Sequence, residues 1–282
     1  MKKICFFSLA LCLLFNSLNG AELKKLWSTK PVLKTPESVN YDPERNVLYV
    51  SNINGNPTEK DGNGFISKLS LDGKIIKLKW VTGLNAPKGA AIYDNKLYVS
   101  DIDHLIEIDI PSGKILHRYP APGAVFLNDV AVDLKGNIYI SDSSGKNSAI
   151  YKFYNGKISR WLKDSEIDKP NGLFLTINGN LLVGTYGKGD LKRINLTTKK
   201  ITTIAQVGFG IDGLKLDGKG NYLVSDWKGK TALVTKQGKV ELLLDTSSKN
   251  INSADIEFII KKNLLLIPTF FDNRVSAYQL TQ

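Results

Sequence analysis

A short segment recurs six times along this chain, and that repetition constrains the possible folds more than any other feature. Counted at the second residue of each copy, the spacings are 51, 40, 43, 41 and 42 residues. A period near 42 residues is the length that a four-stranded propeller blade requires. The six copies are Pro36-Glu37-Ser38-Val39, Pro87-Lys88-Gly89-Ala90, Leu127-Asn128-Asp129-Val130, Pro170-Asn171-Gly172-Leu173, Ile211-Asp212-Gly213-Leu214 and Ser253-Ala254-Asp255-Ile256.

Each copy is followed by a turn rich in Gly, Asn or Asp and then by an apolar strand, as in residues 46–50 and 137–140. β-Branched and aromatic residues between such turns are typical of strands, and no window shows a sustained helical period. The sequence therefore predicts an all-β, six-bladed β-propeller. The sixth repeat ends one strand short, at residues 275–280, and residues 23–28 resemble a fourth strand. We expect this N-terminal strand to complete the last blade and close the ring.

Several recurring features are better explained by the scaffold than by chemistry. A Ser-Asp pair follows the second strand in three repeats, where a turn hydrogen bond is expected. Trp80, Trp161 and Trp227 are interpreted as blade core or rim. The three pairs are Ser100-Asp101, Ser141-Asp142 and Ser225-Asp226.

The first 21 residues are typical of a secretory signal, with Lys2 and Lys3 before a short apolar run that ends in Gly20 and Ala21. Acylation of Cys12 is the alternative, but Leu11 stands where a small residue is expected. Both cysteines of the chain lie in this segment. No later segment is long and apolar enough to span a membrane. We therefore expect residues 22–282 to form one propeller domain in the periplasm or outside the cell.

The formal net charge of the chain is +11, which raises the question of an anionic partner. The lysines are spread through every repeat, and many fall in the last strand, as in residues 74–79. Lysine on an exposed edge strand discourages aggregation between edges. This dispersion favours a solvated rim over a nucleic-acid surface.

One column of the repeat varies from blade to blade, unlike the scaffold positions. Four of its six members supply a side-chain oxygen, which suits a hard cation, most naturally Ca²⁺, with Mg²⁺, Mn²⁺ or Zn²⁺ as alternatives. Their shared position predicts convergence at one mouth of the channel. Taken singly, Asn171-Gly172 and Asp212-Gly213 are also compatible with ordinary turns, and Lys88 with a solvated side chain. The column consists of Glu37, Lys88, Asn128, Asn171, Asp212 and Ala254. A shift of one residue would bring Asp129 or Asp255 to the channel instead.

At these residues the chain resembles the SMP-30/gluconolactonase family of six-bladed propellers. The matching segments are Pro36-Glu37, Asn128-Asp129, residues 132–137, Pro170-Asn171-Gly172-Leu173 and Ile211-Asp212-Gly213-Leu214. The resemblance implies a divalent metal held by Glu37, Asn171 and Asp212, with Asn128 beside the substrate or a bound water. It also implies hydrolysis of lactones, with Asp212 helping to activate the water.

Phe126 departs from the family pattern, because sugar-lactone members usually carry an arginine two residues before the Asn-Asp pair. This substitution disfavours polyhydroxylated substrates and favours a more apolar lactone or ester. The alternative is a non-catalytic propeller that binds a ligand or a protein partner at the same face. Lys88 is a candidate contact for an anionic substrate group or a developing oxyanion.

Three other signals were weighed against the propeller interpretation. Residues 208–213 match a dinucleotide-binding pattern, but a turn follows instead of a helix. His104 and His117 lack the serine elbow of a histidine-dependent hydrolase, so structural roles are expected. The polar loop 54–64 lengthens the first repeat and is either a lid at the channel mouth or an idle insertion.

Overall fold

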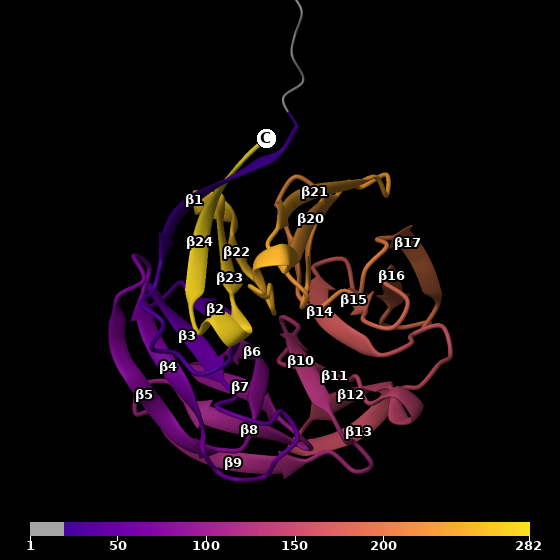
Figure 1. Cartoon of the computed structure of the whole chain (residues 1–282). Helices are drawn as coiled ribbons and strands as arrows, with labels where there is room; N and C mark the ends of the chain where they lie inside the picture. The colour runs from indigo at the N-terminus through magenta and orange to yellow at the C-terminus, as the bar shows by residue number, and fades with distance from the viewer. Residues whose placement is uncertain (1–19) are drawn as a thin grey trace, which may run out of the picture.

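Six four-stranded antiparallel sheets are arranged in a ring around a central channel (Figure 1). This computed structural model describes residues 20–282. Within this range there is no helix long and apolar enough to cross a membrane. The all-β six-bladed propeller predicted from the repeat is confirmed. The predicted signal segment lies almost entirely outside the described residues, and so do Cys5 and Cys12.

The bounds of the strands follow the repeat, with the innermost strand first in each blade. The first two blades contain β2 (Pro36–Asp42), β3 (Val47–Asn52), β4 (Gly64–Ser70), β5 (Ile75–Leu84), and β6 (Pro87–Tyr93), β7 (Lys96–Asp101), β8 (His104–Asp109), β9 (Lys114–Pro120). The next two contain β10 (Leu127–Val132), β11 (Ile138–Asp142), β12 (Ala149–Tyr154), β13 (Lys157–Leu162), and β14 (Pro170–Thr176), β15 (Asn180–Thr185), β16 (Asp190–Asn195), β17 (Ile201–Gln206). The last two contain β18 (Leu214–Leu216), β19 (Tyr222–Asp226), β20 (Lys230–Val234), β21 (Val240–Asp245), and β22 (Glu257–Ile259), β23 (Leu264–Pro268), β24 (Val275–Thr281), β1 (Glu22–Ser28). Short 3-10 helices η1 (Gly145–Asn147), η2 (Ser247–Lys249), η3 (Ile260–Lys262) and η4 (Phe270–Asp272) connect some of them.

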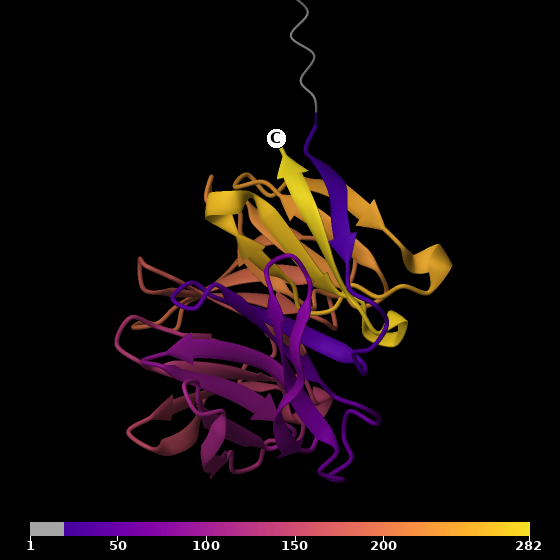
Figure 2. The ribbon, with the colours of Figure 1, turned by 90° about the vertical axis from the view of Figure 1, so that its left-hand side faces the viewer.

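The ring is closed by the first strand of the chain. β1 pairs antiparallel with β24, from Glu22 opposite Thr281 to Ser28 opposite Ser276. The two strands lie side by side next to the C-terminus in both ribbon views (Figure 2). The predicted completion of the sixth blade is therefore confirmed. Pairing the first and last strands leaves β24 without an open edge.

The core lies between successive blades, where each sheet packs its apolar side chains on the next. Tyr49 of β3 packs with buried residues of β7 and β8, and Trp80 stacks on it with ring centroids 4.7 Å apart. Trp161 meets Tyr139 edge to face at 5.1 Å. These contacts confirm the structural interpretation of Trp80 and Trp161, because both rings pack between strands and not on a free platform.

The repeated Ser-Asp pairs tie the scaffold together, as expected. The Asp101 carboxylate accepts a hydrogen bond from the backbone N–H of Ala86 at 2.7 Å, and the Asp142 carboxylate accepts one from Val125 at 2.9 Å. The hydroxyl of Ser225 donates to the carbonyl of Ala254 in the next blade at 2.7 Å. The aspartates therefore hold the loops that lead into the inner strands, and the serine links neighbouring blades.

Candidate functional site

The site begins with irregular backbone at the start of the inner strands. Pairing of the first two strands in a blade shifts between Pro36 and Ser38, and the same shift occurs at the start of β6, β10 and β14. A bulge of this kind twists the strand and re-aims a side chain. In the fifth blade Asp212 lies just before β18, and its backbone N–H donates to the carbonyl of Ser225 at 2.7 Å. The residues of the variable column therefore lie where the hydrogen bonding between the first two strands of a blade is interrupted.

The column residues converge on one cavity of about 660 Å³ at this mouth of the channel. All six side chains to which the sequence analysis assigned a role line it: Glu37, Lys88, Phe126, Asn128, Asn171 and Asp212. Ala254, the remaining member of the column, is fully buried in an apolar cluster with Ile53 and Phe270. The expectation that these positions share one mouth therefore agrees with the geometry. A volume of this size is ordinary for a small-molecule site.

Three of these side chains each present an oxygen that lacks a hydrogen-bond partner among the described residues. They are Glu37 Oε2, Asn171 Oδ1 and Asp212 Oδ2, on residues that are 3–4% exposed. The amide of Asn171 donates from Nδ2 to Asp212 Oδ1 at 2.6 Å, which fixes the orientation of both groups. A buried oxygen without a partner is costly. A positive group at this position would give all three oxygens a partner.

The electrostatics of the two carboxyl groups point the same way. Burial raises the pKa of Glu37 well above its usual value, and the neighbouring carboxylates of Asp212 and Asp255 raise it further. Burial also raises the pKa of Asp212 to about 7, although the hydrogen bond from Asn171 opposes this shift. Both groups are disfavoured as anions in the protein alone. A cation between them would remove that penalty.

A divalent cation fits the donor set at Glu37, Asn171 and Asp212. Residues 20–282 contain no group of three or more His, Cys, Asp or Glu residues that could hold a metal. The present set differs from such a group because its third member is an amide oxygen. Two carboxylates and an amide are hard oxygen donors, which suit Ca²⁺, Mg²⁺ or Mn²⁺ better than softer ions. The three unpartnered oxygens are the donors that such an ion needs.

The glycines that follow the column residues serve a close approach between blades. A Cβ at Gly172 would lie 2.6 Å from the carbonyl oxygen of Asp212, and one at Gly213 would lie 2.5 Å from the backbone nitrogen of Ile256. Neither glycine has a positive φ, so turn conformation does not require them. The alternative that Asn171-Gly172 and Asp212-Gly213 are ordinary turns is therefore wrong. Glycine lets the inner strands pack closely enough to bring Asn171 to Asp212.

Lys88 is buried instead of solvated, so the simpler alternative for this residue is also wrong. It is 1% exposed, and its Nζ donates to the carbonyls of Pro57 at 2.9 Å and Ala86 at 3.1 Å. The ammonium lies 4.5 Å from the centroid of the Phe126 ring, which is within cation–π range. Burial lowers its pKa to about 8, against the opposing effect of the Glu37 carboxylate.

The contact with Pro57 also places the loop 54–64. Gly55 and Pro57 line the cavity, and Lys60 in the same loop forms an ion pair with Asp103 at 2.6 Å. The segment therefore lies at the channel mouth, where a lid would have to lie, and not away from the cavity. The loop forms one wall of the cavity and is tied to the second blade by Lys88 and Lys60.

The register ambiguity at Asp129 and Asp255 is resolved by their contacts. Neither lines this cavity. The carboxylate of Asp129 accepts from the backbone N–H of Leu173 at 2.6 Å, and Asp255 lies 3.8 Å from the ammonium of Lys215. Both are buried inside the channel beyond the column, so Asn128 and not Asp129 faces the site.

Sequence reasoning missed the aromatic wall of the cavity. Tyr186, Trp227, Phe270 and Phe271 line it, and the last three form a cluster with ring centroids 4.9–5.6 Å apart. Phe271 is 61% exposed at the rim. A second column of the repeat could have found two of them, Tyr186 and Trp227, because Ile53, Ser143, Tyr186 and Trp227 each follow the last residue of a second strand. His104 and His117 do not line the cavity.

Comparison of the sequence with family models and with curated proteins finds no match to either. Solved structures share the fold. A candidate gluconolactonase is 18% identical with a TM-score of 0.67, covering 93% of each chain. A catalytically inactive variant of virginiamycin B lyase from Staphylococcus aureus, with quinupristin, is 14% identical with a TM-score of 0.62, covering 93% of this chain and 100% of the lyase. A chain of a nidogen/laminin complex is 17% identical with a TM-score of 0.60, covering 76% of this chain and 86% of that chain. At these identities the likeness establishes a propeller fold shared by enzymes and by proteins that bind other proteins.

Proposed function

We propose that this protein is an exported hydrolase of apolar lactones or related esters that works with one divalent cation, most naturally Ca²⁺. The observation that supports this function best is the trio of unpartnered oxygens on Glu37, Asn171 and Asp212 at one cavity. Such oxygens serve little purpose in a structural core, where buried polar groups are normally paired. The resemblance to lactone-hydrolysing propellers at the same three positions agrees with this assignment.

The proposed roles follow from the contacts of each side chain. A bound cation would polarise the ester carbonyl and offset the negative charge that develops on its oxygen. Asp212 acts as the base that takes up the proton of the attacking water, and the hydrogen bond from Asn171 to its Oδ1 fixes the orientation of this carboxylate. Asn128 lines the cavity and is placed to orient the water or the substrate. The acyl C–O bond then breaks, and Asp212 returns the proton to the leaving oxygen. A lactone opens to a single hydroxy acid, and an open-chain ester gives an alcohol and a carboxylic acid.

Lys88 acts as a positioning residue in this scheme. Two of its three N–H groups are committed to the carbonyls of Pro57 and Ala86, so it holds the loop 54–64 at the mouth. Its positive charge also faces the same channel as Glu37, whose carboxylate raises the pKa of the lysine. This ammonium keeps the field at the site less negative before the cation binds.

The substrate class follows from the walls. Phe126, Tyr186, Trp227 and Phe271 line the cavity beside the polar column, and Phe126 stands at the position where the sugar-lactone members carry an arginine. A ligand with an acyl chain or an aryl group would cover these rings, whereas a polyhydroxylated sugar would leave its hydroxyls against them.

The test combines cation binding with turnover. The protein is stripped with chelator, and Tb³⁺ luminescence sensitised by the neighbouring Trp227 is recorded, followed by competition with Ca²⁺, Mg²⁺, Mn²⁺ and Zn²⁺. Hydrolysis of a panel from γ-butyrolactone to long-chain and aryl lactones is assayed in parallel. We expect Asp212→Asn to abolish turnover and to weaken cation binding by about 10–100-fold. Glu59→Gln serves as the control, because it removes an exposed carboxylate from the loop 54–64 at the same mouth of the channel. Turnover that survives Asp212→Asn refutes the mechanism.

A second candidate function is a non-catalytic propeller that binds a ligand or a protein at this face. The exposed Phe271 at the rim favours it, because exposed aromatic side chains are common anchors in interfaces. Cation binding without hydrolysis of any ester, together with capture of a partner that Phe271→Ala abolishes, would favour this function over catalysis.

The proposed export rests on the N-terminal segment. β1 begins at Glu22, directly after the predicted signal, and cleavage at that point would leave the ring-closing strand complete. N-terminal sequencing of protein from the periplasm or the medium tests this: a mature chain that begins beyond Lys24 would contradict it.

A further inference from the structure

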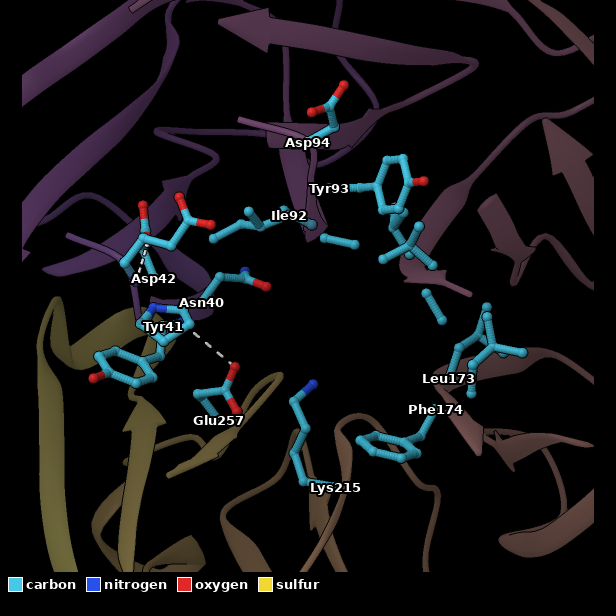
Figure 3. Close-up of a pocket in the computed structure, with 18 of the residues that line it drawn as sticks. Asn40, Tyr41, Asp42, Ile92, Tyr93, Asp94, Leu173, Phe174, Lys215 and Glu257 are labelled. Carbon is cyan, nitrogen blue, oxygen red and sulfur yellow. Dashed lines mark hydrogen bonds between the residues drawn. The ribbon is translucent and has the colours of Figure 1, made fainter. Parts of the chain in front are cut away.

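A second cavity, of about 500 Å³, lies at the opposite mouth of the channel. The inner strands all run from the first mouth toward this one, so residues a few positions after the column line it (Figure 3). Asn40 lies three residues after Glu37, Leu173 two residues after Asn171, and Lys215 three residues after Asp212. No residue proposed for ester hydrolysis takes part in it.

One side of this cavity is polar and carries unused hydrogen-bonding capacity. Asn40 is 8% exposed, its side-chain amide has no hydrogen bond to another residue between 20 and 282, and Figure 3 shows it turned into the cavity. The ammonium of Lys215 also points inward, and the carboxylate within ion-pair distance of it in the described chain is that of Asp255, whose Oδ1 lies 3.8 Å away. That distance is too long for a hydrogen bond. A buried amide and an ammonium are therefore both open to a ligand.

Glu257 completes the polar side. Its Oε1 accepts from its neighbour Phe258 at 2.8 Å and its Oε2 from the backbone of Tyr41 at 3.4 Å. These bonds fix the carboxylate facing the cavity, and each oxygen keeps a further lone pair. Burial lowers the pKa of Lys215, but the carboxylates of Asp255 and Glu257 outweigh it and raise that pKa above its usual value. Lys215 and Glu257 therefore present one positive and one negative group to this side of the cavity. Of the other acidic residues that line it, Asp42 and Glu44 pair with Arg45, and Asp94 points away from Lys215 in Figure 3.

The other side of the cavity is apolar. Ile92 and Leu173 lie across the cavity from Lys215 and Glu257 in Figure 3, and Phe174 lies beside Lys215. Val132 and Leu175 also line the cavity. A carboxylate alone would satisfy Lys215 but face Glu257, and an amine alone would satisfy Glu257 but face Lys215. Only a ligand that carries both charges meets both partners.

We infer that this mouth binds a zwitterionic α-amino acid with an apolar side chain. The α-ammonium donates to Glu257 and to the Oδ1 of Asn40, the α-carboxylate accepts from Lys215 and from the Nδ2 of Asn40, and the side chain lies on the apolar wall. This inference is independent of the proposed ester hydrolysis, since the two sites share no residue.

Isothermal titration calorimetry of residues 22–282 with L-leucine tests the inference. N-acetyl-L-leucine, L-leucinamide and glycine each remove one feature: the ammonium, the carboxylate or the side chain. We expect L-leucine to bind and each analogue to bind at least about tenfold more weakly. No heat of binding with L-leucine at millimolar concentration overturns the inference, and equal binding of the acetylated or amidated analogue overturns the head-group assignment.

Variants locate the binding at this mouth. Asn40→Ala and Lys215→Met should each weaken L-leucine binding by about tenfold or more. Lys135→Met removes an exposed lysine from the turn after β10 and is the matched control. Because Lys215→Met leaves Asp255 without its ion pair, circular dichroism must show that this variant is folded. Asn40→Ala tests L-leucine binding a second time without removing an ion pair. Wild-type affinity in both variants overturns the inference.

Discussion

The substitution Gly172→Ala tests how the site is held together. Gly172 has no positive φ, so alanine costs nothing in backbone conformation. Its Cβ would lie 2.6 Å from the Asp212 carbonyl oxygen and 3.0 Å from the Leu214 Cβ, so the inner strands must separate by a few tenths of an ångström. Such overpacking costs about 1–3 kcal/mol, and the lower entropy of the unfolded alanine chain offsets roughly 0.4–1 kcal/mol. We expect a net loss of about 1.3 kcal/mol, within a range of roughly 0–2.6 kcal/mol, in the free energy of unfolding.

The same displacement should reach the proposed cation site. Functional constellations tolerate displacements of only about 0.5 Å. Asn171 lies in β14 and Asp212 just before β18, so separation of these inner strands moves the two residues apart. Urea unfolding and Tb³⁺ titration of the same samples measure both effects, and we expect cation affinity to fall about 10–100-fold. Gly179→Ala is the control in the same blade: its φ is +73° and its Cβ meets no atom within 4 Å. It should cost about 1–2 kcal/mol through φ strain alone and leave cation binding unchanged. Unchanged stability of Gly172→Ala would refute the close-approach argument, and equal cation affinities would refute the coupling.

Three further predictions concern the same mouth. Lys88→Met removes the hydrogen bond to the carbonyl of Pro57 in the loop 54–64, so limited proteolysis should cleave this loop faster than in the wild type. An unchanged rate would show that the lysine does not hold the loop. In metal-free protein the pKa of Asp212 is about 7 against an ordinary 3.8, so between these pH values the folded state binds a proton that the unfolded state lacks. The free energy of unfolding should therefore rise as the pH falls from 7 toward 4. Asp212→Asn should flatten this profile in urea titrations at several pH values. Phe271→Ala should change stability by less than about 0.5 kcal/mol because the ring is exposed. It should still lower kcat/KM for long-chain lactones more than for γ-butyrolactone, and an equal loss for both would argue against an apolar wall.

The repeat alone was enough to predict the architecture. Each blade is a local antiparallel meander, so strand order follows chain order, and alternation of apolar residues with Gly, Asn and Asp turns marks every strand. Even ring closure was predictable, because the last repeat is one strand short and residues 23–28 have the pattern of the missing strand.

The candidate site was predictable only in part. Equivalent positions of a repeat occupy equivalent places in a ring, which is why Glu37, Asn128, Asn171 and Asp212 share one mouth. The bulge that turns Asn128 toward the site and Asp129 into the channel has no signal in a single sequence, since both residues fit either position.

What only the tertiary structure decided depends on contacts between blades. The burial of Lys88 arises from a carbonyl in a loop about thirty residues earlier in the chain, and the need for glycine at 172 arises from a backbone atom of the next blade. The ion pair of Lys215 with Asp255, at 3.8 Å, likewise joins two neighbouring blades. Local periodicity determines which segments are strands, whereas the distances across the channel follow from packing six blades around one axis, and these distances decide which polar side chains remain open to a ligand.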